Sequence, residues 1–205
     1  MTRREDYLAV QKLNKIADPR RLPIGGTLMV PAELLRMEPI TGQIASFRGD
    51  VNVSGQPATL GMKILQGMRV ETGANAFVTV ALPDKSSISL PSQSRVSVVK
   101  LRRVLLTGGI QRTFRVTEGR ARASVNPIRE PGSDFQVTTP LSVAAVRGTD
   151  FRIAYDEAGG RALTEVVGGT VAVQAEADKN ETSVPKGYGV ISTPAGSEPP
   201  VALLS

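Results

Sequence analysis

The chain of 205 residues contains no cysteine, no histidine and no tryptophan, and only 4% of its residues are aromatic. Without histidine and cysteine there is no zinc finger, no imidazole-bound catalytic zinc, no disulfide framework and no nucleophile system that depends on either residue. Carboxylates, Lys, Tyr and the Ser/Thr hydroxyls remain, and this set supports glycosidase or Ser-Lys chemistry. The composition therefore points away from most enzyme classes and predicts neither a metal nor a cofactor.

Long hydrophobic runs are also missing. No stretch approaches the roughly 20 apolar residues of a membrane-spanning helix, so we expect no transmembrane segment. The arginine pair at Arg3 and Arg4 is not followed by an apolar stretch, so we expect no secretory signal within the sequence as given. Absence of cysteine is compatible with a reducing cytosol and with a periplasm. The 20 glycines and 14 prolines indicate many turns and short strands.

Positive charge is concentrated in one segment. The net charge is +6, and nine of the 25 basic residues lie between residues 95 and 129, with Glu118 as the one acid there. This segment is either a solvated strand face or a surface that attracts anions or a partner. The candidates for that face are Arg112, Arg115, Arg120 and Arg122. Phe114 is the one aromatic residue of the segment, so base stacking is poorly supported and we predict no nucleic-acid partner.

The two parts of the chain differ in their periodicity. Residues 5–16 have an apolar spacing near 3.6 and predict a helix, which Pro19 follows. Residues 27–30 predict a short strand that Pro31 ends. From about residue 40 onward we find only short alternating segments separated by turn residues.

Three segments share the pattern G-x-[VA]-x-[VA], at residues 49–53, 119–123 and 169–173. In a strand this pattern places the apolar residues on one face and the polar residues on the other. The glycine is expected in a turn or bulge with positive φ. The unequal spacing of the three units argues for one continuous β domain and against a regular repeat array.

Two hairpins are also predicted. One turns at Pro83–Ser86, where Pro suits the second position of a type I turn, and the other turns at residues 156–160. Together these patterns predict an all-β fold, either a rolled or twisted β-solenoid or a sandwich of short antiparallel strands.

From Gly42 to about Ser192 the order of these features resembles the FecR domain. The most specific segment is Thr139-Pro140 followed by VAAVRGTDF at residues 143–151, which is similar to the family signature TP-x-x-VA-x-VRGT-x-F. Lys85 departs from the glycine that members usually carry after Asp. We interpret the signature as structural, and its residues are Thr139, Pro140, Arg147, Gly148, Thr149, Asp150 and Phe151.

Local chemistry gives this signature three expected roles. Pro140 should end a strand, and Gly148 should permit a bulge. Arg147 and Asp150 are close enough in sequence for an ion pair, or Asp150 could accept backbone N–H bonds at the bend.

Residues 13–31 resemble the second half of a LysM module, so a small α+β remnant of that module is expected at the N-terminus. LysM modules bind N-acetylglucosamine chains, and the resemblance implies glycan contacts by Asn14, Ile16, Asp18, Arg20, Arg21 and Leu22. The first half of the module is missing from the sequence. We therefore expect that half, and an export signal, upstream of Met1.

The sequence thus divides into a partial LysM-like segment (1–31), a linker (32–40), a FecR-like β domain (41–194) and a C-terminal tail (195–205). FecR-type proteins reside in the bacterial envelope. The resemblance implies a binding or scaffolding protein of the periplasm or cell envelope that is not an enzyme. Its expected partners are peptidoglycan or another glycan, and possible further partners are another envelope protein or copies of itself. The sequence leaves two alternatives open, a self-assembling structural component and a glycan-cleaving enzyme that uses carboxylates among Asp150, Asp156, Glu157 and Glu165.

Overall fold

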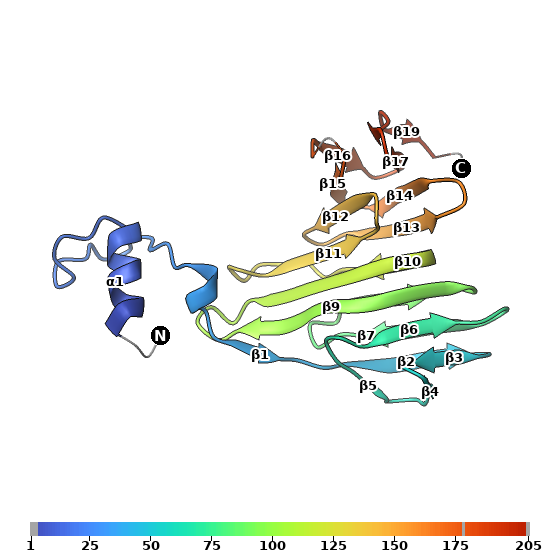
Figure 1. The fold of residues 1–205 in the computed structure, drawn as a ribbon, viewed down its shortest axis with the longest axis horizontal. Helices are drawn as coiled ribbons and strands as arrows, with labels where there is room; N and C mark the ends of the chain where they lie inside the picture. Colours follow the sequence, from blue (N-terminus) through green and yellow to red (C-terminus); the bar gives the residue numbers. More distant parts are fainter. Residues whose placement is uncertain (1–3, 178, 204–205) are drawn as a thin grey trace.

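The computed structural model describes residues 4–177 and 179–203, which form a short N-terminal helical segment followed by strands and turns (Figure 1). The helix α1 (Arg4–Leu13) and the 3-10 helix η1 (Ala32–Leu34) come before the first strand. The fold is therefore all-β with one short helix, as the sequence predicts. Within the described ranges, no helix is both long enough and apolar enough to cross a membrane.

The strands form two sheets, which we call sheet A and sheet B. Sheet A contains β1 (Met37–Pro39), β3 (Val51–Val53), β4 (Gln56–Pro57), β6 (Arg69–Thr72), β9 (Ser94–Val104), β11 (Asp134–Thr138), β12 (Ser142–Val146), β15 (Thr170–Ala175) and β16 (Glu181–Pro185). Sheet B contains β2 (Gly42–Arg48), β5 (Lys63–Ile64), β7 (Phe77–Ala81), β8 (Ser87–Leu90), β13 (Asp150–Asp156), β14 (Arg161–Gly168), β17 (Tyr188–Thr193), β18 (Gly196–Ser197) and β19 (Val201–Ala202). The long strand β10 (Ile110–Ser124) belongs to both sheets.

Neighbouring strands are antiparallel, with one exception in the described part of the chain. The first half of β10 pairs with β11 in parallel, from Gln111 opposite Asp134 to Arg115 opposite Thr138. The exception arises because β10 continues into sheet B before residues 125–133 bring the chain back to sheet A. Across both sheets the strands lie roughly in chain order, from β1–β5 at one end of the molecule to β15–β19 at the other (Figure 1).

Alternating apolar residues of both sheets form one hydrophobic core. Phe114 and Phe135 enter it from sheet A, with ring centroids 5.6 Å apart, and Phe151 and Ile153 enter it from sheet B. Burying alternate side chains leaves the other side of each sheet toward solvent, so each sheet has an inner face and an outer face.

The three G-x-[VA] units lie where the chain passes from one sheet to the other. Their glycines, Gly49, Gly119 and Gly169, have φ values of 75°, 74° and 82°, and the apolar residues that follow them are buried. Both predictions for the pattern are thus confirmed. Each unit places a left-handed residue at a corner, and the corner turns the next strand into the opposite sheet.

Both predicted hairpins are present. β7 and β8 pair around a turn in which Lys85 has a φ of 66°, and β13 and β14 pair around residues 157–160. Lys85, where FecR domains usually carry glycine, therefore has a left-handed backbone conformation that glycine would adopt with less strain.

The N-terminal segment departs from its prediction. The helix ends at Leu13, and residues 27–30 do not form a strand. The reason is the amide of Asn14, which accepts a hydrogen bond from the Met29 N–H and donates one to the Met29 carbonyl, both at 2.7 Å. A side chain thus satisfies the backbone groups that a strand partner would otherwise take. The segment from 32 to 40, expected as a linker, contains η1 and β1, and β1 pairs with the end of β9.

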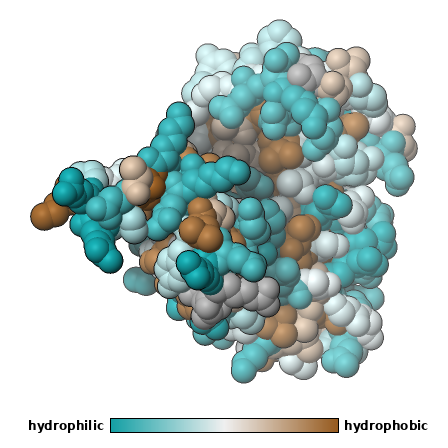
Figure 2. All heavy atoms as spheres, turned by 60° about the vertical axis from the view of Figure 1, so that its left-hand side comes forward, coloured by the Kyte–Doolittle hydropathy of each residue, from teal (hydrophilic) through white to brown (hydrophobic). Residues whose placement is uncertain are grey.

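This N-terminal segment projects from the β body and exposes apolar side chains (Figures 1 and 2). Only Val10 of α1 is buried. The large apolar residues that remain exposed here are Tyr7, Leu8, Leu13, Leu22, Ile24, Leu28 and Met29. Its own residues therefore supply little core, and its order depends on local contacts such as those of Asn14.

We predict that Gly119→Ala destabilises the fold by about 3 kcal/mol, because alanine is strained at this φ and its Cβ would collide with the carbonyl oxygen of Gln93. Gly187→Ala is the matched control, since Gly187 has a φ of 84° but nothing within 4 Å of an added Cβ. The control should cost about 1 kcal/mol. Urea unfolding measures both values, and equal losses would show that the Gly119 corner is not closely packed.

Candidate functional site

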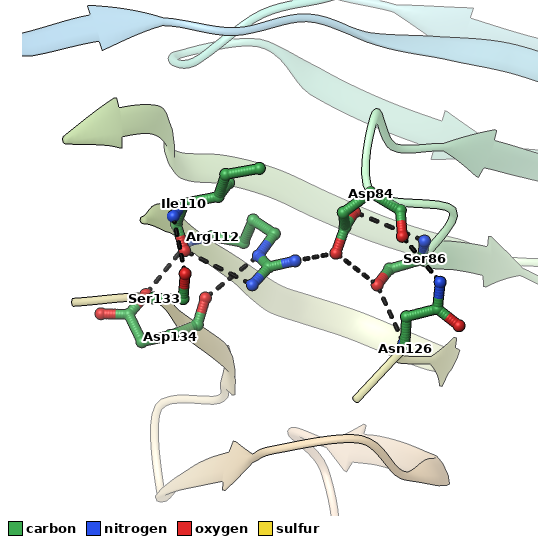
Figure 3. A network of polar contacts seen from close by, with 7 residues as sticks. All are labelled: Asp84, Ser86, Ile110, Arg112, Asn126, Ser133 and Asp134. Atoms are coloured by element: carbon green, nitrogen blue, oxygen red, sulfur yellow. Dashed lines mark hydrogen bonds and ion pairs between the residues drawn. The ribbon is translucent and has the colours of Figure 1, made fainter. Parts of the chain in front are cut away.

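Arg112 lies inside the fold and not on a surface. Its side chain is 2% exposed and points from β10 into the core, with the guanidinium 5.5 Å from the centre of the Phe135 ring. The guanidinium pairs with the Asp84 carboxylate and donates to the carbonyls of Asp134, at 3.1 Å, and Ile110, at 3.4 Å (Figure 3). The prediction that Arg112 belongs to an exposed basic face is therefore wrong. It fails because residues 112, 114 and 116 share the inward face of β10.

The partner of Arg112 comes from the other sheet. Asp84 sits in the turn between β7 and β8 of sheet B, where it also accepts a hydrogen bond of 2.7 Å from Ser86 Oγ. Asn126, just after β10, donates from its side chain to the Asp84 carbonyl and from its backbone to Ser86 Oγ (Figure 3). The network ties the β7–β8 turn of sheet B to β10 and β11 of sheet A. We assign it a structural role, because its polar groups are occupied by one another.

Arg115 lies on the outer face of sheet A. It is exposed, and its register neighbours are Ser97 on β9 and Thr138 on β11. The corner at Gly119 follows it, and the next two arginines, Arg120 and Arg122, emerge on the outer face of sheet B. The predicted basic face is thus divided between the two sheets.

On sheet B, two cross-strand rows define the surface around these arginines. One row runs from Ser89 through Arg122 and Arg152 to Glu165. The other runs from Arg120 through Ala154 and Leu163 to Ile191. A polar row thus lies beside an apolar row that begins at Arg120.

Arg122 is held by Asp150 in a bidentate pair, with Nε to Oδ1 at 3.0 Å and Nη2 to Oδ2 at 2.6 Å. The hydrogen bond and the charge of Asp150 raise the pKa of Arg122 above its ordinary value. The sequence expected Asp150 to pair with Arg147 or with backbone N–H groups, and the ion-pair expectation is wrong. The chain changes sheets at Gly148. Arg147 lies in the bend after β12 of sheet A, whereas Asp150 starts β13 of sheet B, beside β10 and Arg122.

The rows enclose a hollow of about 400 Å³ on the outer face of sheet B. The apolar side chains that line it belong to Phe77, Pro91, Ala154 and Leu163, and Ala121 and Ile153, whose side chains are buried in the core, also border it. Arg120, Arg122, Arg152 and Ser89 supply the polar lining. An apolar hollow with arginines at its margin is the arrangement in which protein interfaces concentrate binding energy. We take this surface, which we call the sheet B hollow, as the candidate binding site.

The signature residues lie in two bends. Thr139 Oγ1 accepts hydrogen bonds from the N–H groups of Leu141 and Ser142 in the turn that Pro140 opens after β11. At the other bend, a Cβ on Gly148 would meet Pro127 Cα at 2.8 Å, and Thr149 Oγ1 donates to the Thr170 carbonyl at 3.3 Å. Phe151 is fully buried and Arg147 is exposed.

The residues expected to contact glycan lie together on the projecting segment. Asn14 is occupied by the backbone of Val10 and Met29, and Ile16 is half-buried. Asp18 binds the Arg20 N–H at 3.0 Å and lies 3.7 Å from the Arg21 guanidinium. Arg20, Arg21 and Leu22 are exposed. Glycan binding by this segment stays a prediction.

The carboxylates considered for glycan cleavage are mostly paired. Asp150 is bound to Arg122, Asp156 lies 3.3 Å from Arg161, and Glu165 lies 3.9 Å from Arg152. Glu157 is exposed in a turn. In the ranges that the structure describes, no group of three or more acidic residues is arranged to hold a metal ion.

Sequence reasoning found Arg120 and Arg122 but missed the other parts of the hollow. Phe77 lies more than 70 residues before Arg152 and Leu163 in the chain, and strand register brings the three together. The alternation in each strand indicates that these side chains face outward. The local pattern of a single strand does not indicate which other strands will lie next to it.

These observations define a two-sheet β domain with a surface suited to binding. The profile of the family described as FecR protein matches residues 68–172, which is half of the sequence and includes the strands from β6 to the start of β15. The chain belongs to the FecR family. The match does not reach residues 1–31, so it gives no support to the LysM resemblance.

Solved structures with a similar fold are consistent with this assignment. Two crystal structures of a candidate anti-sigma factor from Parabacteroides distasonis ATCC 8503, at 2.50 and 1.65 Å resolution, each have a TM-score of 0.50 and 18% identity to this chain. The alignment covers 66% of this chain and 58% of that one, so this chain matches little more than half of that protein's length. At this identity the likeness is one of fold. No curated protein matches the chain.

We predict that Arg112→Leu costs about 3 kcal/mol of stability, because it leaves the half-enclosed Asp84 carboxylate without its cation. Arg115→Leu, on the solvated face of the same strand, should change stability by no more than about 0.5 kcal/mol. Urea unfolding of the single variants and of Arg112→Leu combined with Asp84→Leu tests the pair. Strictly additive losses would contradict an energetic link between Arg112 and Asp84.

Proposed function

We propose that this chain is a non-catalytic regulatory protein of the bacterial cell envelope that works by binding a partner protein through the sheet B hollow. The observation that carries the proposal is the hollow itself, an apolar depression on the outer face of sheet B that is lined by three arginines. Membership of the FecR family supports a regulatory role, and the fold likeness is to a candidate anti-sigma factor.

The scaffold is suited to recognition because the surface is built on paired strands and not on loops. Arg120, Ala154 and Leu163 are held in register by three adjacent strands of sheet B, so the row has a fixed spacing. The Arg122–Asp150 pair fixes a second side chain beside it. Fixed side chains lose little entropy on binding, which favours affinity at a small surface.

The rival proposal of a glycan-cleaving enzyme is less well supported. Glycoside hydrolysis needs two carboxyl groups that face the substrate, one as acid and one as base or nucleophile. Asp150 accepts two hydrogen bonds from Arg122, and the Asp156 carboxylate accepts one from Arg161 and one from the Gly159 N–H. Binding a partner, unlike glycoside hydrolysis, does not require an unpaired carboxylate.

Site-specific cross-linking in the native host tests the proposed function. A photoreactive p-benzoylphenylalanine replaces Leu163 in the sheet B hollow or, as a matched control, the half-buried Val143 on the outer face of sheet A. We expect a discrete heavier adduct in the envelope fraction from position 163, at least about ten times stronger than from position 143. The adduct should be lost when Arg120→Glu is added. Equal adducts at both positions, or none at either, would refute binding through this surface.

A further inference from the structure

We propose that the sheet B hollow takes a partner segment in which a large apolar side chain stands next to a carboxylate. This inference rests on the proposed function and specifies the chemistry of the partner. It follows from a difference among the three arginines at the hollow: two of them have an acidic partner within the chain, and the third has none in the part of the chain that the structure describes.

Two of the three arginines have acidic neighbours within the chain. Arg122 is bidentate to Asp150, and Arg152 lies 3.9 Å from Glu165. The Arg120 guanidinium has no ion pair within the described residues, although its backbone N–H is bound to Ser94 Oγ. The hollow therefore carries one positive charge without an intramolecular partner.

The position of Arg120 determines what an anion there would touch. Its direct register neighbour is Ala154, and Leu163 follows on the next strand. Pro91 and the exposed ring of Phe77 also line the hollow. A carboxylate bound to Arg120 thus places the atoms beside it over an apolar floor. An acidic residue followed by an aromatic or aliphatic one matches both features at once.

Size and shape favour a polypeptide segment. About 400 Å³ lies within the range of ligand sites, but the depression is formed by the outer face of one sheet and so stays open to solvent. A small molecule would remain largely exposed there, whereas a protein segment can cover the hollow and bring one anchoring side chain into it. A nucleic acid is disfavoured because it gains affinity from many unpaired cations, and this surface offers one.

Peptide selection tests the inference on the full chain. A random 12-residue library displayed on phage is selected on the immobilised protein and counter-selected on the Arg120→Glu variant. We expect enriched peptides that carry Asp or Glu within two positions of Phe, Tyr, Leu or Ile. Enrichment of peptides without an acidic residue, or no enrichment at all, would overturn the proposal.

The enriched peptides are then synthesised and their affinity is measured by fluorescence anisotropy at about 150 mM salt. Arg120→Glu should weaken binding at least about tenfold and Arg120→Ala should weaken it less, because reversal adds repulsion to the loss of attraction. Leu163→Asp should also weaken binding at least about tenfold. Arg115→Glu, on the outer face of sheet A, is the matched control and should change affinity by less than about twofold. Equal binding to the Arg120 variants and the wild-type chain would overturn the proposal, and circular dichroism checks that each variant is folded.

The two proposals fail separately. If position 163 cross-links to a partner in the host but the selected peptides lack acidic residues, the binding surface stands and its proposed chemistry is wrong. If the peptides match but no cross-link forms at position 163, the hollow binds such segments and the proposed function is wrong.

Discussion

The change of sheet within β10 determines where the arginines of this protein lie. Before Gly119 the strand belongs to sheet A and sends Arg112 into the core and Arg115 to solvent. After the corner it belongs to sheet B and sends Arg120 and Arg122 to a different outer face. Because side chains alternate along a strand, a one-residue shift at the corner would exchange inner and outer positions for everything that follows. The close packing of Gly119 against Gln93 and Ser94 holds this register.

The arginines of the basic segment 95–129 consequently have different structural roles. Arg112 joins the two sheets through Asp84, and Arg122 joins β10 to β13 through Asp150. Both guanidinium groups form ion pairs within the fold. Arg120, beside the apolar row of Ala154 and Leu163, remains available to a partner. The net charge of the segment thus overstates the charge that a partner meets. In our account, recognition depends on one available arginine beside an apolar floor.

Much of the fold could be predicted from local sequence. Glycines at 49, 119 and 169 before alternating apolar residues predicted the corners, and the turn residues of 83–86 and 156–160 predicted the hairpins. Contacts between distant segments could not be predicted in this way. The Asp84–Arg112 pair spans 28 residues, and the hollow combines five strands or strand ends, so both depend on strand order. The expected strand at 27–30 failed because the Asn14 side chain took its backbone partners.

The sorting of the arginines is tested most directly by chemical footprinting of the folded protein with phenylglyoxal, which modifies accessible guanidinium groups, followed by mass spectrometry of the peptides. We predict that Arg115 and Arg120 react readily, that Arg122 reacts more slowly because Asp150 occupies its guanidinium, and that Arg112 reacts only after unfolding in urea. Modification of Arg112 in the folded chain at the rate of Arg115 would contradict the account.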